Sequence, residues 1–364
     1  MSNRHNVLLM VRELNLGGCE RDLARTAIAL KGTEFYPVVA CFRDEGFRRQ
    51  ELDAAGIEVI TIPVRSLASK AALEWMWKLS KMLRTRPFDI VHAFDVPSAM
   101  FAGLAAPLAP KSRFLAAQLS YRATYLPREQ ALMWLADRTA HTVVVNSQAV
   151  AEDLVTNHGV RRDKIQLVYN GVDPNEFSPG DRVTQSPLVI GTVAALRPEK
   201  RLELLVEAFA RVHTAMPDTK LVIVGSGSVE PALRQQAQSL GIADACHFEP
   251  ATREVPRWLR SIDVFVSTSE TESFSNSILE ALACRCCVVA SRVGGTPEMV
   301  EDQQSGLLFP SGDVEALANC LLAVCRDPEL RERLAQAGCE RAHQMFSLQT
   351  NLCRTQELYR SVLA

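Results

Sequence analysis

Short apolar runs alternate with segments of helical periodicity along almost the whole chain. Runs of about four to eight consecutive apolar residues are typical of strands that are buried on both faces of a parallel sheet. Their alternation with helices predicts an α/β fold of the doubly wound, Rossmann-like kind, in which helices cover parallel sheets. The strands that the pattern predicts are Asn6–Val11, Tyr36–Cys41, Val59–Ile62, Asp89–Ala93, Thr142–Val145, Lys164–Val168, Leu188–Thr192, Lys220–Val224, Val264–Ser267 and Cys287–Ser291.

The pattern breaks near the middle of the chain. The stretch from Asn170 to Asp181 is rich in turn-forming residues and shows little periodicity, and a new strand follows at Leu188. With 364 residues, the chain is also too long for one small core. We therefore predict two domains, residues 1–178 and 185–345, with the ligand site in the cleft between them. Residues 346–364 have helical spacing, and we expect this C-terminal helix to pack back on the first domain.

Composition and charge narrow the function classes. The net charge of -2 does not indicate a nucleic-acid-binding protein. No window of about 18 or more apolar residues predicts a transmembrane helix. The apolar run at Val7–Val11 is too short for the core of a signal peptide. We expect a cytoplasmic protein, with peripheral binding at the inner face of the cytoplasmic membrane as an alternative.

The ten cysteines are scattered along the chain. Cys284, Cys286 and Cys287 cluster, but no second pair at metal-ligand spacing accompanies them. We expect reduced, buried thiols rather than a zinc or redox site.

One predicted helix, Ala71–Arg86, is basic and carries two tryptophans. Its apolar positions form a stripe that we expect to face the core. The alternative is a helix that lies on an anionic membrane surface. The stripe consists of Leu73, Met76, Trp77, Ser80 and Leu83.

The most informative segment is Ser269–Ala283, in which a polar loop leads into an apolar helix. We expect Ser275 or Asn276 to cap this helix, since short polar side chains accept the free backbone N–H groups of a first turn. Such a helix start is a natural seat for phosphate. Glu272 and Glu280 flank that seat, an arrangement that suits a ligand with hydroxyls at both ends, such as a nucleotide sugar. The alternative is a surface loop followed by an ordinary amphipathic helix.

Glycine-containing turns follow several predicted strands. Gly17 and Gly18 allow a close backbone approach to a ligand, and Arg21 adds a donor one turn later. The segment 225–227 lacks the third glycine of a dinucleotide fingerprint, which leaves a phosphate- or base-adjacent loop and a plain turn as equal alternatives. The segment 294–298 again places paired glycines before a helix. For each segment, a purely structural turn is the competing interpretation.

Two further candidates carry charge or can move a proton. Arg197 and Lys200 belong to a basic cluster at a helix start marked by Pro198, where cations suit a diphosphate. Charge runs are more often solvated faces, which is the alternative. His92 ends a predicted strand at the carboxyl edge of a parallel sheet, a place suited to chemistry. A packed, hydrogen-bonded histidine is the alternative there.

Taken together, these motifs resemble a known family, the retaining glycosyltransferases of family 4, which have the GT-B fold of two Rossmann-like domains facing a central cleft. The resemblance extends over nearly the whole chain, and its specificity lies in the order and spacing of the pieces. The matching segments are GGCER at 17–21, DIVHA at 89–93, VVNS at 144–147, YNGVD at 169–173 with Phe177 and Pro179, RPEK at 197–200, SFSNSILEA at 273–281, GGTPE at 294–298 and SGLLF at 305–309 with Gly312 and Asp313.

The resemblance implies roles for the site residues. Glu280 is expected to hold the ribose hydroxyls, Glu272 to contact the donor sugar, and Lys200 to neutralise the leaving diphosphate. Glu272, Lys200 and His92 are the candidate catalytic residues. No metal or other cofactor is expected, because cations and helix dipoles take its place, and retention is expected to proceed by front-face attack. The remaining donor-binding candidates are Gly17, Gly18, Arg21, Arg197, Gly225, Ser273, Phe274, Ser275 and Leu279.

Four features depart from the family pattern. Ala195 stands where an arginine is usual, five positions before the lysine, and Arg197 is the nearest substitute. A first-domain histidine is missing around 115–120, where Gln118, Ser120 and Arg122 occupy the area. The third departure is Ser273 in place of glycine, and the fourth is the neighbouring Arg285 and Cys287 in place of glycine and proline.

The resemblance implies a glycosyltransferase that moves a sugar from a nucleotide-sugar donor to a glycan, polysaccharide or lipid-linked acceptor, in cell-envelope or exopolysaccharide biosynthesis. Peripheral membrane contact would accompany a lipid-linked acceptor. Two alternatives stay open: a nucleotide-sugar-binding protein or scaffold without turnover, and an epimerase or phosphorylase on the same fold.

Overall fold

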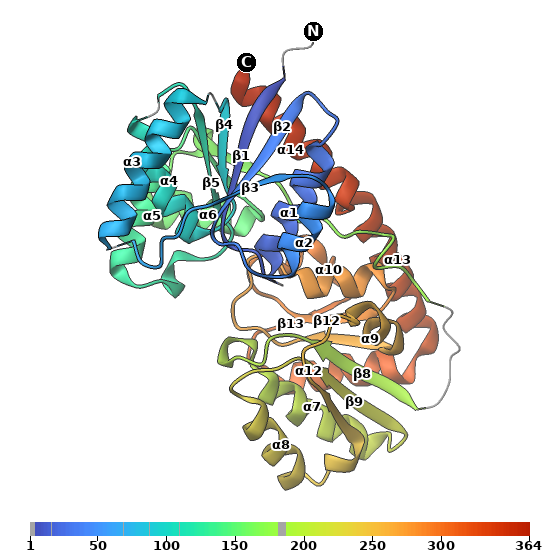
Figure 1. Ribbon diagram of the computed structural model, residues 1–364. Coiled ribbons are helices and arrows are strands. Elements are labelled where there is room, and N and C mark those ends of the chain that lie inside the picture. Colours follow the sequence, from blue (N-terminus) through green and yellow to red (C-terminus); the bar gives the residue numbers. More distant parts are fainter. Residues whose placement is uncertain (1–3, 16, 68, 87, 109, 181–186) are drawn as a thin grey trace. The chain divides into compact units, whose positions relative to one another are not determined.

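A computed structural model describes residues 4–15, 17–67, 69–86, 88–108, 110–180 and 187–364. The chain divides into two compact units (Figure 1). The first unit comprises Met1–Tyr169 and Asn351–Ala364, and the second comprises Asn170–Thr350. The division thus lies at Tyr169, before the turn-rich segment rather than at residue 178 within it.

The first unit is built on a seven-stranded parallel sheet with the order β3-β2-β1-β4-β5-β6-β7. Its inner strands are continuous apolar runs, as in β1, where Val7–Val11 are fully buried. Such runs suit a sheet that is covered on both faces. The strands are β1 (His5–Glu13), β2 (Phe35–Arg43), β3 (Glu58–Thr61), β4 (Ile90–Ala93), β5 (Arg113–Gln118), β6 (Thr142–Val145) and β7 (Ile165–Leu167).

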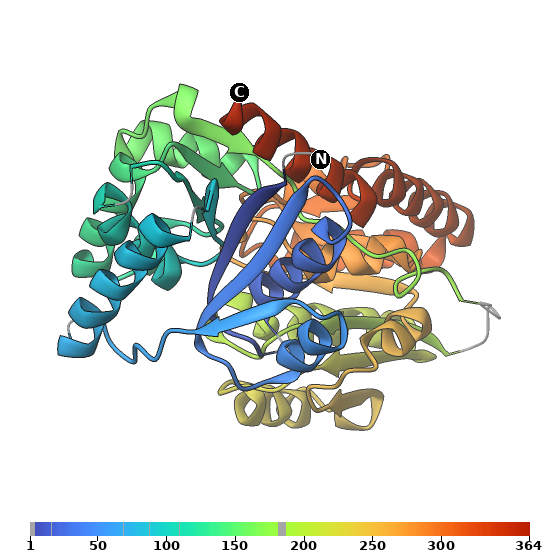
Figure 2. The same cartoon turned by 45° about the horizontal axis from the view of Figure 1, so that its top comes forward.

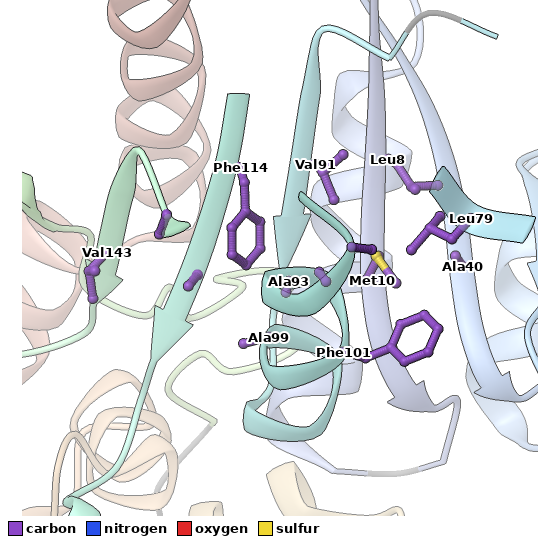
Figure 3. Packing of buried hydrophobic residues seen from close by; sticks show 14 of the residues in the cluster. Leu8, Met10, Ala40, Leu79, Val91, Ala93, Ala99, Phe101, Phe114 and Val143 are labelled. Atoms are coloured by element: carbon purple, nitrogen blue, oxygen red, sulfur yellow. The ribbon is translucent and has the colours of Figure 1, made fainter. Parts of the chain in front are cut away.

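Alternate side chains of β1 enter two different cores, one on each face of the sheet. Leu8 and Met10 pack with α3, α4 and α6, whereas Val7, Leu9 and Val11 pack with α1, α2 and α14. Figure 3 shows Leu8, Met10 and Phe101 in the first of these cores, and the helices flanking β1 and β2 are visible in Figure 2. The helices are α1 (Gly18–Leu30), α2 (Phe47–Ala54), α3 (Lys70–Thr85), α4 (Val96–Ala105), α5 (Pro127–Thr139), α6 (Gln148–His158) and α14 (Leu348–Leu363).

The last helix of the chain, α14, is part of the first unit. Tyr359 is fully buried and its ring meets Phe35 edge-on, with centroids 5.5 Å apart. The guanidinium of Arg360 donates to Glu34 at 2.7 Å. Asn351 donates to the Tyr169 carbonyl at 2.6 Å, where the chain leaves this unit.

The second unit has a six-stranded parallel sheet with the order β10-β9-β8-β11-β12-β13. Helices α7, α8, α12 and α13 share one core with its strands, and α10 lies against β11, β12 and α13. Its strands are β8 (Leu188–Val193), β9 (Thr219–Val224), β10 (Cys246–Glu249), β11 (Val264–Ser267), β12 (Cys287–Ser291) and β13 (Leu307–Phe309). Its helices are α7 (Leu202–Ala215), α8 (Glu230–Ser239), α9 (Val255–Ser261), α10 (Asn276–Ala283), α11 (Thr296–Met299), α12 (Val314–Arg326) and α13 (Pro328–Met345).

These two parallel-sheet units confirm the predicted α/β, Rossmann-like fold class. The prediction missed three strands. β5 has alanine at two of its six positions and a polar residue at each end, which weakens its strand signal, and β10 and β13 are short strands at the edges of their sheet. All ten cysteines are free thiols, and Cys284, Cys286 and Cys287 are buried.

The predicted core-facing stripe of α3 is confirmed for Met76, Ser80 and Leu83, which are buried or pack against the core, and is wrong for Leu73 and Trp77. Leu73 and Trp77 are 64% and 59% exposed, whereas Ala72, Leu79, Ser80 and Leu83 are buried. The buried positions include an alanine and a serine, whose small side chains let α3 lie close to α4. Close packing between the helices, rather than the size of the apolar side chains, therefore decides which face of α3 is buried. Two large apolar side chains are thereby left on the surface.

The C-terminal end of α10 carries one of the sequence departures. Arg285 has a left-handed backbone, with φ of 62°, where the family usually has glycine. The N–H of Cys286 reaches back to the carbonyl of Ala281 at 2.9 Å, the bond that closes a Schellman-type helix end. Arg285 also pairs with Glu332.

We predict that Arg285→Gly is more stable than Arg285→Ala by about 1 kcal/mol, because only the alanine retains the Cβ clash of the left-handed conformation. Both substitutions remove the ion pair with Glu332, so their difference isolates the backbone effect. Urea unfolding of the two variants measures it. Equal stability, or a more stable alanine variant, would contradict the assignment.

Candidate functional site

The topology of the second unit brings two loops together. The strand order reverses at β8, which pairs with β9 on one side and with β11 on the other. The loops that follow β8 and β11 therefore meet at the carboxyl edge of the sheet, the usual ligand-binding place in such folds. The hydroxyl of Thr268 donates to the Lys200 carbonyl at 2.7 Å, and the N–H of Glu270 donates to the Glu199 carbonyl at 2.9 Å.

Lys200 and Glu272 form an ion pair where these loops meet. The Lys200 Nζ lies 2.6 Å from the Glu272 Oε2, and their side chains are only 24% and 13% exposed. The hydroxyl of Ser269 donates to the same carboxylate oxygen at 3.3 Å. Partial burial weakens solvent screening, so this pair fixes the position of both charged groups more firmly than a surface pair would.

A third loop holds the backbone of Glu272. The N–H of Gly295, which precedes α11, donates to the Glu272 carbonyl at 3.1 Å. The Ser291 hydroxyl at the end of β12 donates to the Ser269 carbonyl at 2.6 Å. The segments 197–200, 269–275 and 294–298, predicted separately, are therefore one assembly.

The N-terminus of α10 differs from the predicted cap. Among the described residues, no side chain caps this helix, although Ser275 occupies the N-cap position. The Ser275 hydroxyl lies 3.1 Å from the Ser277 hydroxyl, and the side-chain amide oxygen of Asn276 accepts from the side-chain amide of Asn170 at 2.9 Å. The expectation of a Ser275 or Asn276 cap is thus wrong. The first-turn N–H groups face out of the helix without side-chain caps, which favours an anion there.

Glu280 lies one turn into α10 and is 7% exposed, so its carboxylate is held within the unit. Phe274 and Leu279 are also buried, and the Phe274 ring meets Phe346 edge-on with centroids 5.5 Å apart. The side chains of Phe274 and Leu279 therefore belong to the packed interior of this unit. Ser273 does not have the positive φ that favours glycine, so serine fits this position without backbone strain.

Gly225 is required by packing. Its φ is 148°, and an added Cβ would lie 1.9 Å from the Ala194 carbonyl oxygen. The N–H of Leu196 donates to the Ser226 carbonyl at 3.0 Å, which joins this turn to the loop after β8. The structural-turn interpretation therefore accounts for Gly225, and the turn acts on the site by holding the loop that carries Lys200.

Arg197 is the cation left available beside the Lys200–Glu272 pair. Its side chain is exposed, and in the described part of the chain no carboxylate pairs with it. Ala195 is also exposed, and its carbonyl accepts from the Arg197 N–H at 2.9 Å. The Arg197 side chain thus projects from the same tight turn that would carry an arginine at position 195.

The glycine turn of the first unit opens α1. Gly17 is the N-cap residue, and its carbonyl accepts from the Arg21 N–H at 3.1 Å. A Cβ on Gly17 would lie 2.0 Å from a carboxylate oxygen of Glu20, so a larger residue here would require the Glu20 side chain to move. Desolvation raises the pKa of Glu20. Gly18 and Arg21 lie in the first turn of this helix.

His92 lies inside the first unit. Its Nδ1 is 2.8 Å from the Tyr359 hydroxyl, and its side chain is fully enclosed by this contact and by Phe94. Desolvation lowers the pKa of His92 to about 3, so the ring is neutral at physiological pH. This geometry matches the packed alternative, and we leave His92 out of the reacting groups.

A buried polar cluster stands where the family histidine is missing. Arg122 pairs with Asp137, which also accepts from the Gln118 amide at 2.9 Å. All three side chains are buried, and desolvation lowers the pKa of Arg122 to about 10. The region is thus filled by the buried Arg122–Asp137 ion pair.

Two family models match consecutive parts of the chain. The model "Glycosyltransferase Family 4" matches residues 16–176, and "Glycosyl transferases group 1" matches residues 175–341. The chain belongs to the group 1 glycosyltransferases. The resemblance inferred from the motifs is confirmed, and with it the GT-B class of its two Rossmann-like units.

Relatives in this family include the D-inositol 3-phosphate glycosyltransferase of Kribbella flavida, which is 32% identical over 64% of this chain and 58% of its own length. The N-acetyl-alpha-D-glucosaminyl L-malate synthase of Bacillus anthracis is 29% identical over 59% of each chain. The matched region therefore spans little more than half the length of these relatives. Anabaena HepE, solved with UDP and glucose, has the same fold, with a TM-score of 0.85, 22% identity and coverage of 98% of this chain and 99% of its own.

The sequence analysis of this group 1 glycosyltransferase missed some residues of the candidate site. Ser269 and Ser291 fix the loop that carries Glu272, and Asn170 holds Asn276. Small polar residues in loops carry no periodic signal. Only the strand order shows that they converge.

We predict that His92 makes folding pH-dependent. Its folded-state pKa of about 3 lies below the ordinary 6.5, so the unfolded chain takes up the proton first as the pH falls. Stability due to this group is complete above pH 6.5 and is lost progressively below it, by at most about 1.4 kcal/mol per pH unit. His92→Asn keeps a partner for Tyr359 without titrating.

Urea unfolding from pH 4.5 to 7.5 tests this. Tryptophan fluorescence reports mainly the first unit, which holds Trp75, Trp77 and Trp134 of the four tryptophans. The parent should lose more stability than His92→Asn between pH 6.5 and 4.5. Parallel curves for the two proteins would contradict a neutral, buried His92.

Proposed function

We propose that this chain transfers a sugar from a nucleotide-sugar donor to an acceptor hydroxyl. The observation that carries this proposal is the Lys200–Glu272 pair beside the open start of α10, with Glu280 in the next turn. These groups lie in the unit that the group 1 model matches. They supply a cation, an anion seat and two carboxylates within one assembly.

The diphosphate of the donor would sit at the start of α10. Its charges would be met by the first-turn N–H groups, the Lys200 ammonium and the Arg197 guanidinium. As the bond to the sugar breaks, negative charge grows on the leaving diphosphate, and positioned donors are worth most at that moment. We propose that this electrostatic support replaces a metal ion, so that turnover is insensitive to chelators.

The two carboxylates would recognise hydroxyl groups. Glu280 is buried, and we propose that it accepts from both ribose hydroxyls. Glu272 is fixed by Lys200 and Ser269, and its proposed partner is a hydroxyl of the sugar. With no nucleophile assigned, we propose front-face attack, in which the acceptor hydroxyl hands its proton to the departing phosphate and the anomeric configuration is retained.

The acceptor is proposed to be a glycan, a polysaccharide or a lipid-linked saccharide of the cell envelope. The names of two relatives specify anionic acceptors, D-inositol 3-phosphate and L-malate. The first unit is the acceptor side in this proposal, since the donor groups belong to the second.

Peripheral contact with the inner face of the cytoplasmic membrane is part of the proposal. Leu73 and Trp77 are exposed on α3, and the Lys81 ammonium lies 5.4 Å from the Trp77 ring centroid. Apolar side chains beside lysines suit an anionic lipid surface. None of the helices in the described part of the chain combines the length and the apolar character that crossing a bilayer requires.

A second candidate function is nucleotide-sugar binding without turnover. Two observations favour it: Ala195 removes one cation from the diphosphate site, and the Arg122–Asp137 pair fills the region of the missing histidine. Incubation with a panel of nucleotide sugars separates the candidates. Nucleotide release stimulated by an acceptor supports transfer, bound donor without release supports a binding protein, and an isomerised donor indicates an epimerase.

We predict that Glu280→Ala weakens nucleotide binding about tenfold or more, because two hydrogen bonds to a charged carboxylate are lost. Glu272→Ala should lower kcat more than it lowers donor affinity, since its partner is the sugar. Titration calorimetry with nucleoside diphosphates and initial rates measure the two effects. Glu207→Ala, at an exposed position of α7, is the control, and behaviour of all three variants like the parent would contradict the site.

We further predict that the double variant Leu73→Ser/Trp77→Ser binds anionic lipid vesicles several-fold more weakly than the parent, because its apolar contact surface is removed. Co-sedimentation measures this, with Leu240→Ser, an exposed leucine of the second unit, as the control. Equal sedimentation of the double variant and the parent would contradict membrane contact through α3.

A further inference from the structure

The first unit contains a groove that the donor chemistry does not use. Its volume is about 440 Å³, within the range of small-molecule sites. It lies where β1 and β2 end, against the segment before α3, most of the length of α4 and the N-terminal part of α5. Its apolar lining consists of Phe42, Val64, Leu67, Pro97, Met100, Leu104 and Leu132.

Four arginines also line this groove, together with one glutamate. Arg12 and Arg43 share the carboxylate of Glu13, at 2.9 and 3.5 Å. Arg65 and Arg128 are exposed, and in the described ranges no carboxylate pairs with either of them.

Among the described residues, the lining glutamate forms no ion pair with Arg65 or Arg128. Glu129 accepts from the Leu126 N–H at 3.0 Å and so closes the start of α5. The guanidinium groups of Arg65 and Arg128 are therefore left to meet an anion, and guanidinium is the side chain best matched to phosphate.

The apolar floor excludes two simpler ligands. An inorganic anion would leave the floor uncovered, and a neutral sugar would place hydroxyls against Phe42, Val64 and Met100, which offer no side-chain hydrogen bonds. A ligand that satisfies both parts has an anion beside a hydrocarbon chain. The groove is continuous in sequence with α3, since Leu67 lies three residues before its first residue, and α3 presents Leu73 and Trp77 to solvent.

We propose that this groove binds the acceptor through a phosphate ester of a hydrocarbon chain, with the phosphate on Arg65 and Arg128 and the chain along the apolar floor. This inference rests on the proposed transferase function and names its acceptor class, a lipid phosphate drawn from the membrane. The anchor is thereby separate from the saccharide that receives the sugar.

Titration calorimetry with decyl phosphate tests the groove, with inorganic phosphate and decyl maltoside as probes for each half of the ligand. We expect decyl phosphate to bind more tightly than either probe. The double variant Arg65→Gln/Arg128→Gln should bind decyl phosphate about tenfold or more weakly than the parent. The control Arg138→Gln, farther along α5 and outside the groove, should change this affinity less than twofold. Leu132→Asn should weaken the binding of decyl phosphate without changing the binding of inorganic phosphate.

Equal binding of decyl phosphate by the parent and the double arginine variant would overturn the proposal, as would decyl maltoside binding as tightly as decyl phosphate. UDP titrated into the same proteins keeps the two claims apart. If UDP binds and decyl phosphate does not, the groove assignment fails alone. If decyl phosphate binds the groove but no nucleoside diphosphate binds the protein, the transferase proposal fails instead.

Discussion

The pairing of β8 with β11 is the constraint on which the proposed site depends. It places two loops side by side that are about seventy residues apart in the chain, and the Lys200–Glu272 ion pair forms where they meet. The glycine turn at Gly225 and the loop before α11 then hold these two loops from either side. The charged groups are therefore held by backbone packing rather than by their own attraction alone.

Charge is distributed unevenly around this frame. Lys200 already has a carboxylate partner, while Arg197 has none among the described residues, so a diphosphate would gain one cation outright and would compete with Glu272 for the other. In the first unit the pattern repeats, since Arg12 and Arg43 share Glu13 but Arg65 and Arg128 do not. In both units the proposed position of an anionic ligand is at the arginines that no carboxylate among the described residues pairs with.

Much of the fold could be predicted from the sequence because strands buried on both faces consist of continuous apolar residues. The bounds of Thr142–Val145, Val264–Ser267 and Cys287–Ser291 were predicted without error, and all three are inner strands. The edge strand β10 was missed, since a half-covered strand needs few apolar residues. Leu73 and Trp77 of α3 were wrongly assigned to the core, because hydrophobic periodicity counts large apolar side chains and does not register how closely Ala72 packs. The motifs predicted the residues of the candidate site. That these segments lie together in space could be seen only from the order of the strands in the sheet.

The central claim is that Lys200 acts on the diphosphate of a bound nucleotide. Affinities of nucleoside and nucleoside diphosphate pairs (uridine and UDP, adenosine and ADP, guanosine and GDP) for the parent and for Lys200→Met test it most directly. Lys200→Met should lower the affinity for the nucleoside diphosphate that the parent binds by about tenfold, while the affinity for the matching nucleoside should change less than twofold. An equal loss for both members of that pair, or no loss for either, would contradict it.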